Sequence, residues 1–206
     1  MMFYDRNQAG EILAEELKRF KKALVLAIPR GGVPVGFAIA KRLGLKLAVV
    51  AVRKHPIPWD PEAGFGAITA DGTLVLNRRL VKQLGLQRAE IEEIARRVLK
   101  EVKRRERVYG KIPPVKGKTV ILVDDGLASG YTMLAALKYV KKLGAGRTLI
   151  AAPVSSLSAY RLLKRHSPIL CLHVSREPLF AVASFYHHFP ELTDEEVLSY
   201  LKQFKS

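Results

Sequence analysis

The chain has 206 residues, 49% of them hydrophobic, a length that suits one α/β domain able to bury a sizeable core. Its formal net charge of +16 at pH 7 favours phosphorylated small molecules or nucleic acid as partners, without deciding between them. A single cysteine, Cys171, excludes an internal disulfide framework, and no run of about 18 apolar residues and no signal-peptide pattern is visible. We therefore expect a cytoplasmic protein without a membrane partner.

Apolar periodicity predicts strands and helices that alternate along most of the chain. In chain order these are a helix over 8–22, a strand over 23–28, a helix over 35–43, a strand over 46–52, a hairpin over 67–76, a helix over 87–109, a strand over 119–123, a helix over 132–142, a strand over 147–152, a helix over 157–165, a strand over 169–173 and a last helix opened by a capping box at 193–196. The alternation is typical of an open, mostly parallel twisted sheet with flanking helices.

Two loops in the first half of the chain carry features of anion sites. The first predicted strand runs into Arg30, Gly31 and Gly32, where the glycines permit close approach of a ligand and Arg30 offers a fork of donors for phosphate oxygens. A tight turn alone would also explain the two glycines. Arg53 and Lys54 follow the strand over 46–52, at the strand end where α/β folds bind ligands.

Residues 120–132 combine more local signals than any other stretch. A hydrophobic strand ends in Asp124 and Asp125, and small residues then lead into a helix. Small residues let successive backbone N–H groups face one point, and the helix adds its positive dipole end, so the loop predicts a phosphate site. The negative charge of the two carboxylates then has to be offset by hydroxyl groups or by Mg²⁺. A sugar phosphate with a metal-bound pyrophosphate supplies both. An ordinary strand-to-helix turn is the alternative.

Two of the remaining segments have an unusual amino-acid composition. Cations crowd residues 96–107 of the long predicted helix, which a solvated helix face explains as well as a polyanion surface does. The stretch 177–190 is rich in aromatic residues, and Phe180, Phe185 and Tyr186 are candidates for stacking on a planar base, although such residues also suit a hydrophobic core.

The sequence from Val120 to Thr132 resembles the phosphoribosyl pyrophosphate (PRPP) motif of the type I phosphoribosyltransferases, and the loops at 30–32 and 53–54 look like their pyrophosphate-binding loops. Glu177-Pro-Leu-Phe180 and the last capping box are similar to a poorly characterised bacterial and archaeal branch of that family. One departure is Gly126, which stands where the family more often has an aliphatic residue and predicts a looser loop. The resemblance implies a single domain over 1–206, with a flexible hairpin loop at 55–77 and a hood over 174–206 built from chain termini.

The resemblance also implies the chemistry. Ribosyl-5-phosphate would pass from PRPP to a nitrogenous base, with purine-like bases among the candidates, and pyrophosphate would leave with Mg²⁺, mostly held by PRPP and water. Asp124 and Asp125 would grip the ribose hydroxyls. The 5-phosphate would bind Gly126, Leu127, Ala128, Ser129, Gly130, Tyr131 and Thr132, and the pyrophosphate would bind Arg30, Gly31, Gly32, Arg53 and Lys54. A homodimer is expected as well.

Two further readings remain open. Some relatives keep the PRPP pocket but act as regulators that bind nucleic acid, which the charge of +16 favours a little, and a purely structural use of the fold is the third. The sequence carries no Walker, dinucleotide-binding, serine-hydrolase or zinc-protease motif, so those reaction classes find no support.

Overall fold

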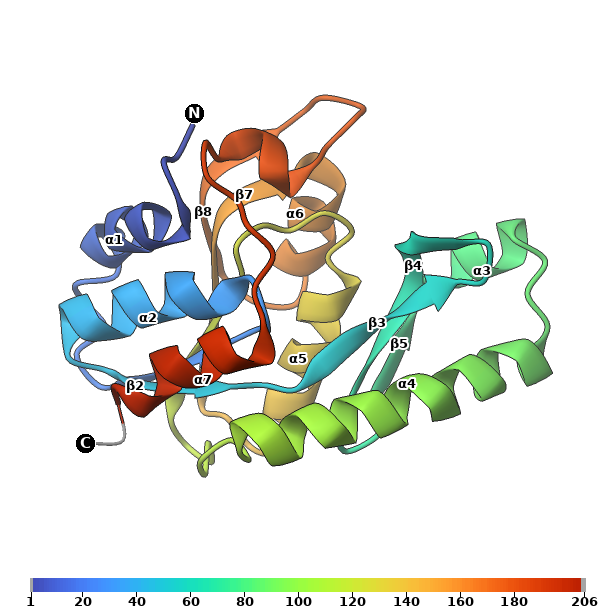
Figure 1. Ribbon diagram of the computed structural model, residues 1–206, viewed down its shortest axis with the longest axis horizontal. Coiled ribbons are helices and arrows are strands. Elements are labelled where there is room, and N and C mark those ends of the chain that lie inside the picture. Colours follow the sequence, from blue (N-terminus) through green and yellow to red (C-terminus); the bar gives the residue numbers. More distant parts are fainter. Residues whose placement is uncertain (1, 205–206) are drawn as a thin grey trace.

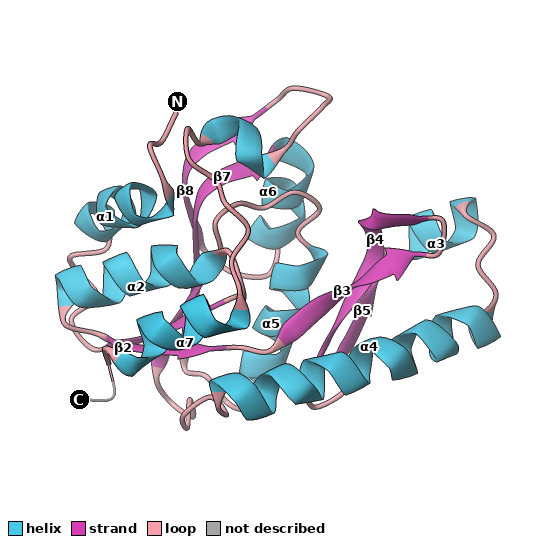
Figure 2. Ribbon diagram, viewed as in Figure 1, coloured by secondary structure: helices cyan, strands magenta, loops and turns pink. Residues whose placement is uncertain are grey.

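A computed structural model describes residues 2–204, apart from the side chain of Glu62, and shows a parallel sheet with helices on both faces (Figures 1 and 2). The sheet has the strand order β2-β1-β6-β7-β8, and all neighbouring strands are parallel. Its strands are β1 (Ala23–Ala27), β2 (Lys46–Val49), β6 (Thr119–Val123), β7 (Arg147–Ser156) and β8 (Ile169–Ser175). The expected open parallel sheet is therefore confirmed.

Helices cover both faces of this sheet because its central strands are apolar on both sides. Residues 120–123 of β6 are fully buried, as the run of β-branched residues and leucine predicts. One face packs against α1 (Arg6–Glu16) and α2 (Gly32–Leu43), and the other packs against α5 (Tyr131–Lys142) and α6 (Leu157–Lys164). The C-terminal helix α7 (Asp194–Lys202) lies beside α2 (Figure 1). No helix within residues 2–204 is long and apolar enough to cross a membrane.

A second, antiparallel sheet stands beside the first and consists of β3 (Val52–Ile57), β4 (Asp60–Thr69) and β5 (Leu74–Leu76). We call it the hairpin sheet. The predicted turn at Asp71 and Gly72 joins β4 to β5. The sheet lies between α5 and the long helix α4 (Arg88–Tyr109), as Figure 2 shows, and buries apolar residues against both. A short helix, α3 (Arg78–Gln83), precedes α4 and was not expected from the sequence.

Two predicted elements need correction. The strand expected over 46–52 is two strands, because the chain leaves the parallel sheet after Val49 and enters the hairpin sheet at Val52. The first helix ends at Glu16 rather than near residue 22, and its buried face is set by Gly10, where an added Cβ would lie 2.6 Å from the carbonyl oxygen of Val35 on α2. Close contact of the two helices thus adds to the apolar positions Leu13 and Leu17, which are both buried.

Candidate functional site

The two acids predicted at the end of β6 lie at the centre of the sheet edge. The backbone N–H of Asp125 donates to Oδ1 of Asp124 at 2.9 Å. Burial, followed by the neighbouring charge of Asp125, raises the pKa of Asp124 well above its usual value. Asp124 therefore holds a proton more readily than an exposed aspartate does, until a cation or a donor group comes beside it.

Asp125 has a different environment, because Arg6 of α1 reaches it from the start of the chain. Arg6 Nε lies 2.8 Å from Asp125 Oδ2, and both side chains are largely buried. The same guanidinium donates to the carbonyl oxygen of Pro190 at 2.8 Å and stacks on the ring of Phe189, 3.7 Å from its centroid. Sequence reasoning missed Arg6, and no local pattern marks it, since its partner is 119 positions away.

The predicted phosphate loop, residues 126–132, is held against β7 by backbone and side-chain hydrogen bonds. The N–H of Leu127 donates to Val154 O at 3.0 Å, and the Ser156 hydroxyl donates to Ala128 O at 2.6 Å. Gly130 has a φ of 81°, a left-handed conformation that suits glycine, and it is the N-cap of α5. The loop is thus set at the N-terminus of a helix, as an anion site requires.

A pocket of about 430 Å³ lies over this loop. Its lining combines the acid Asp124 and the predicted phosphate loop with glycines of β4. The lining residues are Lys54, Ala63, Gly64, Gly66, Asp124, Gly126, Leu127, Ala128, Ser129, Gly130, Thr132 and Met133. We call it the phosphate pocket. The predicted loop residue Tyr131 is the first residue of α5 and does not line it.

Gly126 does not loosen the loop as expected. A Cβ at this position would lie 2.5 Å from Cγ1 of Val182 and 3.0 Å from Cγ2 of Val154, which is closer than real side chains approach. Val182 begins the short 3-10 helix η1 (Val182–Phe185) of the hood. The glycine therefore permits the hood to pack directly on the loop.

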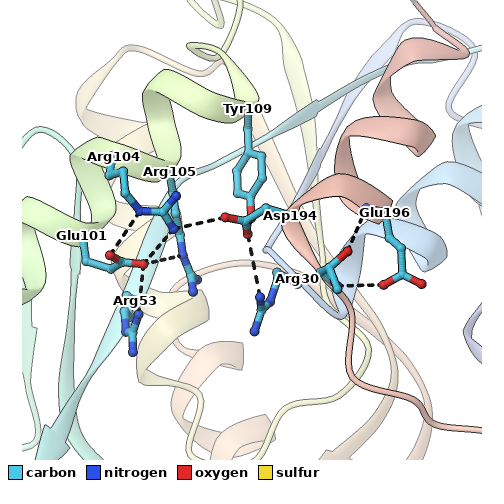
Figure 3. Close-up of polar contacts among 9 residues, drawn as sticks. Arg30, Arg53, Glu101, Arg104, Arg105, Tyr109, Asp194 and Glu196 are labelled. Atoms are coloured by element: carbon cyan, nitrogen blue, oxygen red, sulfur yellow. Dashed lines mark hydrogen bonds and ion pairs between the residues drawn. The ribbon is translucent and has the colours of Figure 1, made fainter.

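The predicted pyrophosphate loop lies against the two acids. A Cβ on Gly31 would meet Oδ2 of Asp125 at 1.9 Å, and one on Gly32 would meet Val123 O at 2.6 Å, so only glycine permits this approach. The peptide bond between Pro29 and Arg30 is cis. The Arg30 guanidinium points toward α7, with Nη1 3.8 Å from Asp194 Oδ1 (Figure 3).

Arg53 and Lys54 do not act from one place, because they are consecutive residues of a strand rather than parts of a turn. Side chains of neighbouring strand residues point to opposite faces. Lys54 lines the phosphate pocket, whereas Arg53 points toward α4, with Nη1 3.3 Å from Oε1 of Glu101. The structure thus brings Lys54 together with Asp124 and separates Arg53 from them.

The three aromatic candidates lie in the hood with unequal exposure. Tyr186 is only 6% exposed; its ring packs between Phe3 and Phe189, and its hydroxyl donates to the backbone oxygen of Asp125 at 2.6 Å. Phe180 and Phe185 are half-buried, with ring centroids 5.4 Å apart. Tyr186 therefore binds the backbone of the acid pair, whereas the rings of Phe180 and Phe185 remain partly exposed to solvent.

A parallel sheet with an acid pair and a phosphate loop at its edge, a covering hairpin and a hood define the phosphoribosyltransferase class of α/β fold. The chain belongs to the phosphoribosyl transferase domain family, whose model matches residues 69–183, more than half of its length. The fold class expected from the sequence and the family resemblance are both confirmed.

Individual relatives agree with this assignment. Two Mycobacterium tuberculosis proteins, from strains CDC 1551 and H37Rv and each named "Putative phosphoribosyl transferase", are 36% identical over 206 residues, which cover 97% of this chain and 46% of theirs. The chain thus spans about half the length of these curated relatives. The crystal structure of TT1426 from Thermus thermophilus is 38% identical, covers 99% of both chains and has a TM-score of 0.80. A hypothetical protein from Neisseria gonorrhoeae with bound ppGpp shares the fold at 13% identity and a TM-score of 0.52, over 98% of this chain and 96% of that one.

Proposed function

We propose that the protein transfers ribosyl-5-phosphate from PRPP to a nitrogen of a base and releases pyrophosphate. The observation that carries this proposal is the phosphate pocket, in which Asp124 faces a loop of backbone donors at the N-terminus of α5. A sugar phosphate fits such a pocket, because backbone N–H groups of the loop donate hydrogen bonds to the phosphate and the carboxylate accepts hydrogen bonds from the ribose hydroxyls.

Each part of the pocket has a separate task in this reaction. The C1–O bond to pyrophosphate breaks, the base nitrogen forms the new bond to C1, and positive charge develops on the sugar. Backbone N–H groups of residues 126–132, other than that of Leu127, which Val154 accepts, hold the 5-phosphate. Lys54, which lines the pocket, stabilises the leaving pyrophosphate together with Arg30, Gly31 and Gly32, whose loop lies against the acids and outside the pocket lining. Arg53 lines a separate cleft and pairs with Glu101 of α4, so the proposal leaves it out of the pyrophosphate site.

Magnesium is part of the proposal through the substrate. No described set of three or more His, Cys, Asp or Glu side chains is placed to hold a metal ion. The carboxylate of Asp124 is an oxygen ligand of the kind that Mg²⁺ prefers, and it fits an ion that arrives with PRPP and its water. When bound, the ion neutralises charge on the leaving pyrophosphate.

The acceptor base would lie under the hood. Phe180 and Phe185 are the stacking candidates that keep exposed ring surface, and a purine-like base fits a planar aromatic platform. The hairpin sheet would close over the sugar during the reaction and exclude water, which could otherwise capture the cationic sugar. We also propose a homodimer and a cytoplasmic location, which sedimentation and fractionation would check.

Calorimetric titration of PRPP with Mg²⁺ tests the central claim. Charge-assisted hydrogen bonds contribute about 1.5–3 kcal/mol each, so the Asp124→Asn, Asp125→Asn double variant should bind PRPP about 10²–10⁴-fold more weakly. Binding within tenfold of the wild type would remove the two acids from the site. A screen for pyrophosphate release over purines, pyrimidines and other amines then identifies the acceptor.

A regulator that binds nucleic acid is the second candidate function, and the cations of α4 are the observation that favours it. Arg96, Lys100, Lys103 and Arg107 are all exposed on that helix. A regulator would bind nucleic acid with steep salt dependence and release no pyrophosphate with any base, whereas an enzyme turns over with at least one acceptor.

A further inference from the structure

Three arginine side chains converge on a single carboxylate oxygen away from the phosphate pocket. Glu101 Oε1 lies 3.3 Å from Arg53 Nη1, 3.0 Å from Arg104 Nη2 and 3.3 Å from Arg105 Nε (Figure 3). Arg53 comes from β3, and the other residues come from α4. Glu101 and Asp194, which also pairs with Arg104, are the two carboxylates beside these three cations, so the cluster retains positive charge.

A cleft of about 600 Å³ opens beside this cluster, between β3 and α4. Its walls include the apolar side chains of Pro56 and Val98, and its charged lining consists of Arg53, Arg97, Lys100, Arg104, Arg107 and the single acid Glu101. We call it the basic cleft. Burial first, and then the charge of Arg105, lower the pKa of Arg53, which shows how closely the cations are crowded.

The basic cleft and the phosphate pocket are separate sites on opposite faces of the hairpin sheet. No residue lines both, and the adjacent residues Arg53 and Lys54 divide between them. Arg104 nevertheless connects the two regions, since its Nη2 also lies 3.1 Å from Oδ2 of Asp194, whose other oxygen faces Arg30 (Figure 3). Two ion pairs, Arg104 with Asp194 and Asp194 with Arg30, therefore connect a ligand of the basic cleft to the loop at residues 30–32.

We propose that the basic cleft binds a polyphosphate anion, such as the phosphate chain of a nucleoside diphosphate or triphosphate. Guanidinium forks match phosphate oxygens in pairs, and two that line the cleft, those of Arg53 and Arg104, already share one oxygen of Glu101, which occupies the position that a phosphate oxygen would take. The cations surround one hollow with an apolar wall. That arrangement suits a compact chain of adjacent phosphates better than the spaced phosphates of a nucleic-acid strand.

The test is calorimetric titration of inorganic tripolyphosphate into the full chain saturated with PRPP and Mg²⁺, so that the phosphate pocket is filled. Arg97→Gln and Arg104→Gln should each weaken binding at least about tenfold, whereas Arg104→Lys, which keeps the charge, should weaken it less. Arg88→Gln is the matched control, because it removes one cation from the same helix at an exposed pair with Glu92. It should leave binding unchanged, as should Lys54→Gln in the phosphate pocket. ATP and GTP replace tripolyphosphate in parallel arms to show whether a nucleoside adds affinity.

Three results would overturn the proposal. They are no binding to the wild type, equal losses in the Arg88 and Arg97 variants, and a loss with Lys54→Gln but none with Arg97→Gln. Tighter binding of a single-stranded oligonucleotide with the same arginine dependence would instead make the cleft a nucleic-acid surface. Arg97 is exposed, so its variant should fold even where Arg104→Gln does not. If the protein binds no PRPP, the proposed function fails, and the titration without PRPP still decides the cleft by comparing Arg97 with Lys54.

Discussion

Two segments beside the phosphate pocket are attached in different ways, and we call them its walls: the hairpin sheet, which lines the pocket, and the hood, which packs on the pocket's loop at Gly126. The hood is fixed to the acids themselves, through the Arg6 pair with Asp125, the Tyr186 hydroxyl on the Asp125 backbone and the close contact of Val182 with Gly126. The hairpin sheet is attached mainly by apolar packing on α4 and α5, with two ion pairs at its edges: Arg53 with Glu101 of α4, and Asp71, at the β4–β5 turn, with Lys142 of α5. Its other turn carries Trp59, which is 64% exposed and is the single tryptophan of the chain.

This difference assigns a role to each wall. A wall bonded to Asp125 keeps its position relative to the acids, so in the proposed reaction the hood is suited to hold the acceptor base in a fixed place. A wall held by packing and by exposed ion pairs opens at lower cost, so in the same proposal the hairpin sheet is suited to closing over PRPP. The hood is thus distinguished from the hairpin sheet by its buried polar contacts with Asp125.

The largest effect is expected when the hood loses Arg6. In Arg6→Gln the carboxylate of Asp125 remains buried without its partner, and removing one member of a buried pair costs about 3–5 kcal/mol. The loss of the contacts to Pro190 and Phe189 should loosen the hood at the same time. Urea unfolding would measure the change in free energy.

A double-mutant cycle with Asp125→Asn is the control for that result. If the pair fixes the hood, the Arg6→Gln, Asp125→Asn double variant should be more stable than the sum of the two single losses predicts, because no charge is left unpaired. Additive losses would show that Arg6 acts through packing alone. The hood would then be attached no more strongly than the hairpin sheet.

Acid should weaken the hairpin sheet through His55. This side chain is fully buried beside Phe65, both of its ring nitrogens lack a hydrogen-bond partner among the described residues, and burial lowers its pKa from 6.5 to about 4. The unfolded chain then binds the extra proton between pH 6.5 and 4, so stability is complete above pH 6.5 and falls as the pH drops through this window. A shift of this size corresponds to a loss of about 3 kcal/mol.

Comparing the pH dependence of the free energy of unfolding in the wild type and in a His55 variant separates the effect of His55 from that of the carboxylates. The free energy of unfolding of the wild type minus that of His55→Leu should fall by about 2–3 kcal/mol between about pH 7 and pH 4.5. Trp59 fluorescence should report the same loosening at the tip of the sheet. A difference that stays constant with pH would mean that His55 finds a partner in solution, and the sheet would be less easily opened than we infer.

The features of these two walls that the sequence predicts are those that depend on contacts between residues close together in the chain. The phosphate loop, the acids and the turn at Asp71 and Gly72 are each encoded within a few consecutive residues, so local sequence patterns locate them. Arg6 and the separation of Arg53 from Lys54 depend on which distant segments meet. The chain changes sheets between Val49 and Val52, but its apolar residues run on without a break, so the pattern predicts the β4–β5 hairpin and misses β3 as its third strand.

A smaller effect is expected from Gly126→Ala, which introduces a methyl group at the contact between loop and hood. The added Cβ would lie 2.5 Å from Val182 Cγ1, and overpacking of this kind costs about 1–3 kcal/mol. Val182→Ala in the same chain should restore most of the lost stability and PRPP affinity. If Gly126→Ala binds PRPP as tightly as the wild type and unfolds at the same urea concentration, the hood does not rest on the loop in solution.

The smallest effect is expected at the turn between β4 and β5 of the hairpin sheet. Lys142 Nζ lies 2.9 Å from Asp71 Oδ2, but the lysine side chain is 65% exposed, and exposed pairs contribute about 0–1 kcal/mol. Asp71 also accepts hydrogen bonds from Thr69 and Thr73, so its turn persists without the lysine. Lys142→Gln should therefore change global stability by less than about 1 kcal/mol. Because the pair ties the sheet to α5, the variant should nevertheless exchange the backbone amides of β4 and β5 faster, while those of residues 182–188 keep their rate. Equal acceleration in both segments would show that hood and hairpin open together, and the distinction between a fixed and a moving wall would fail.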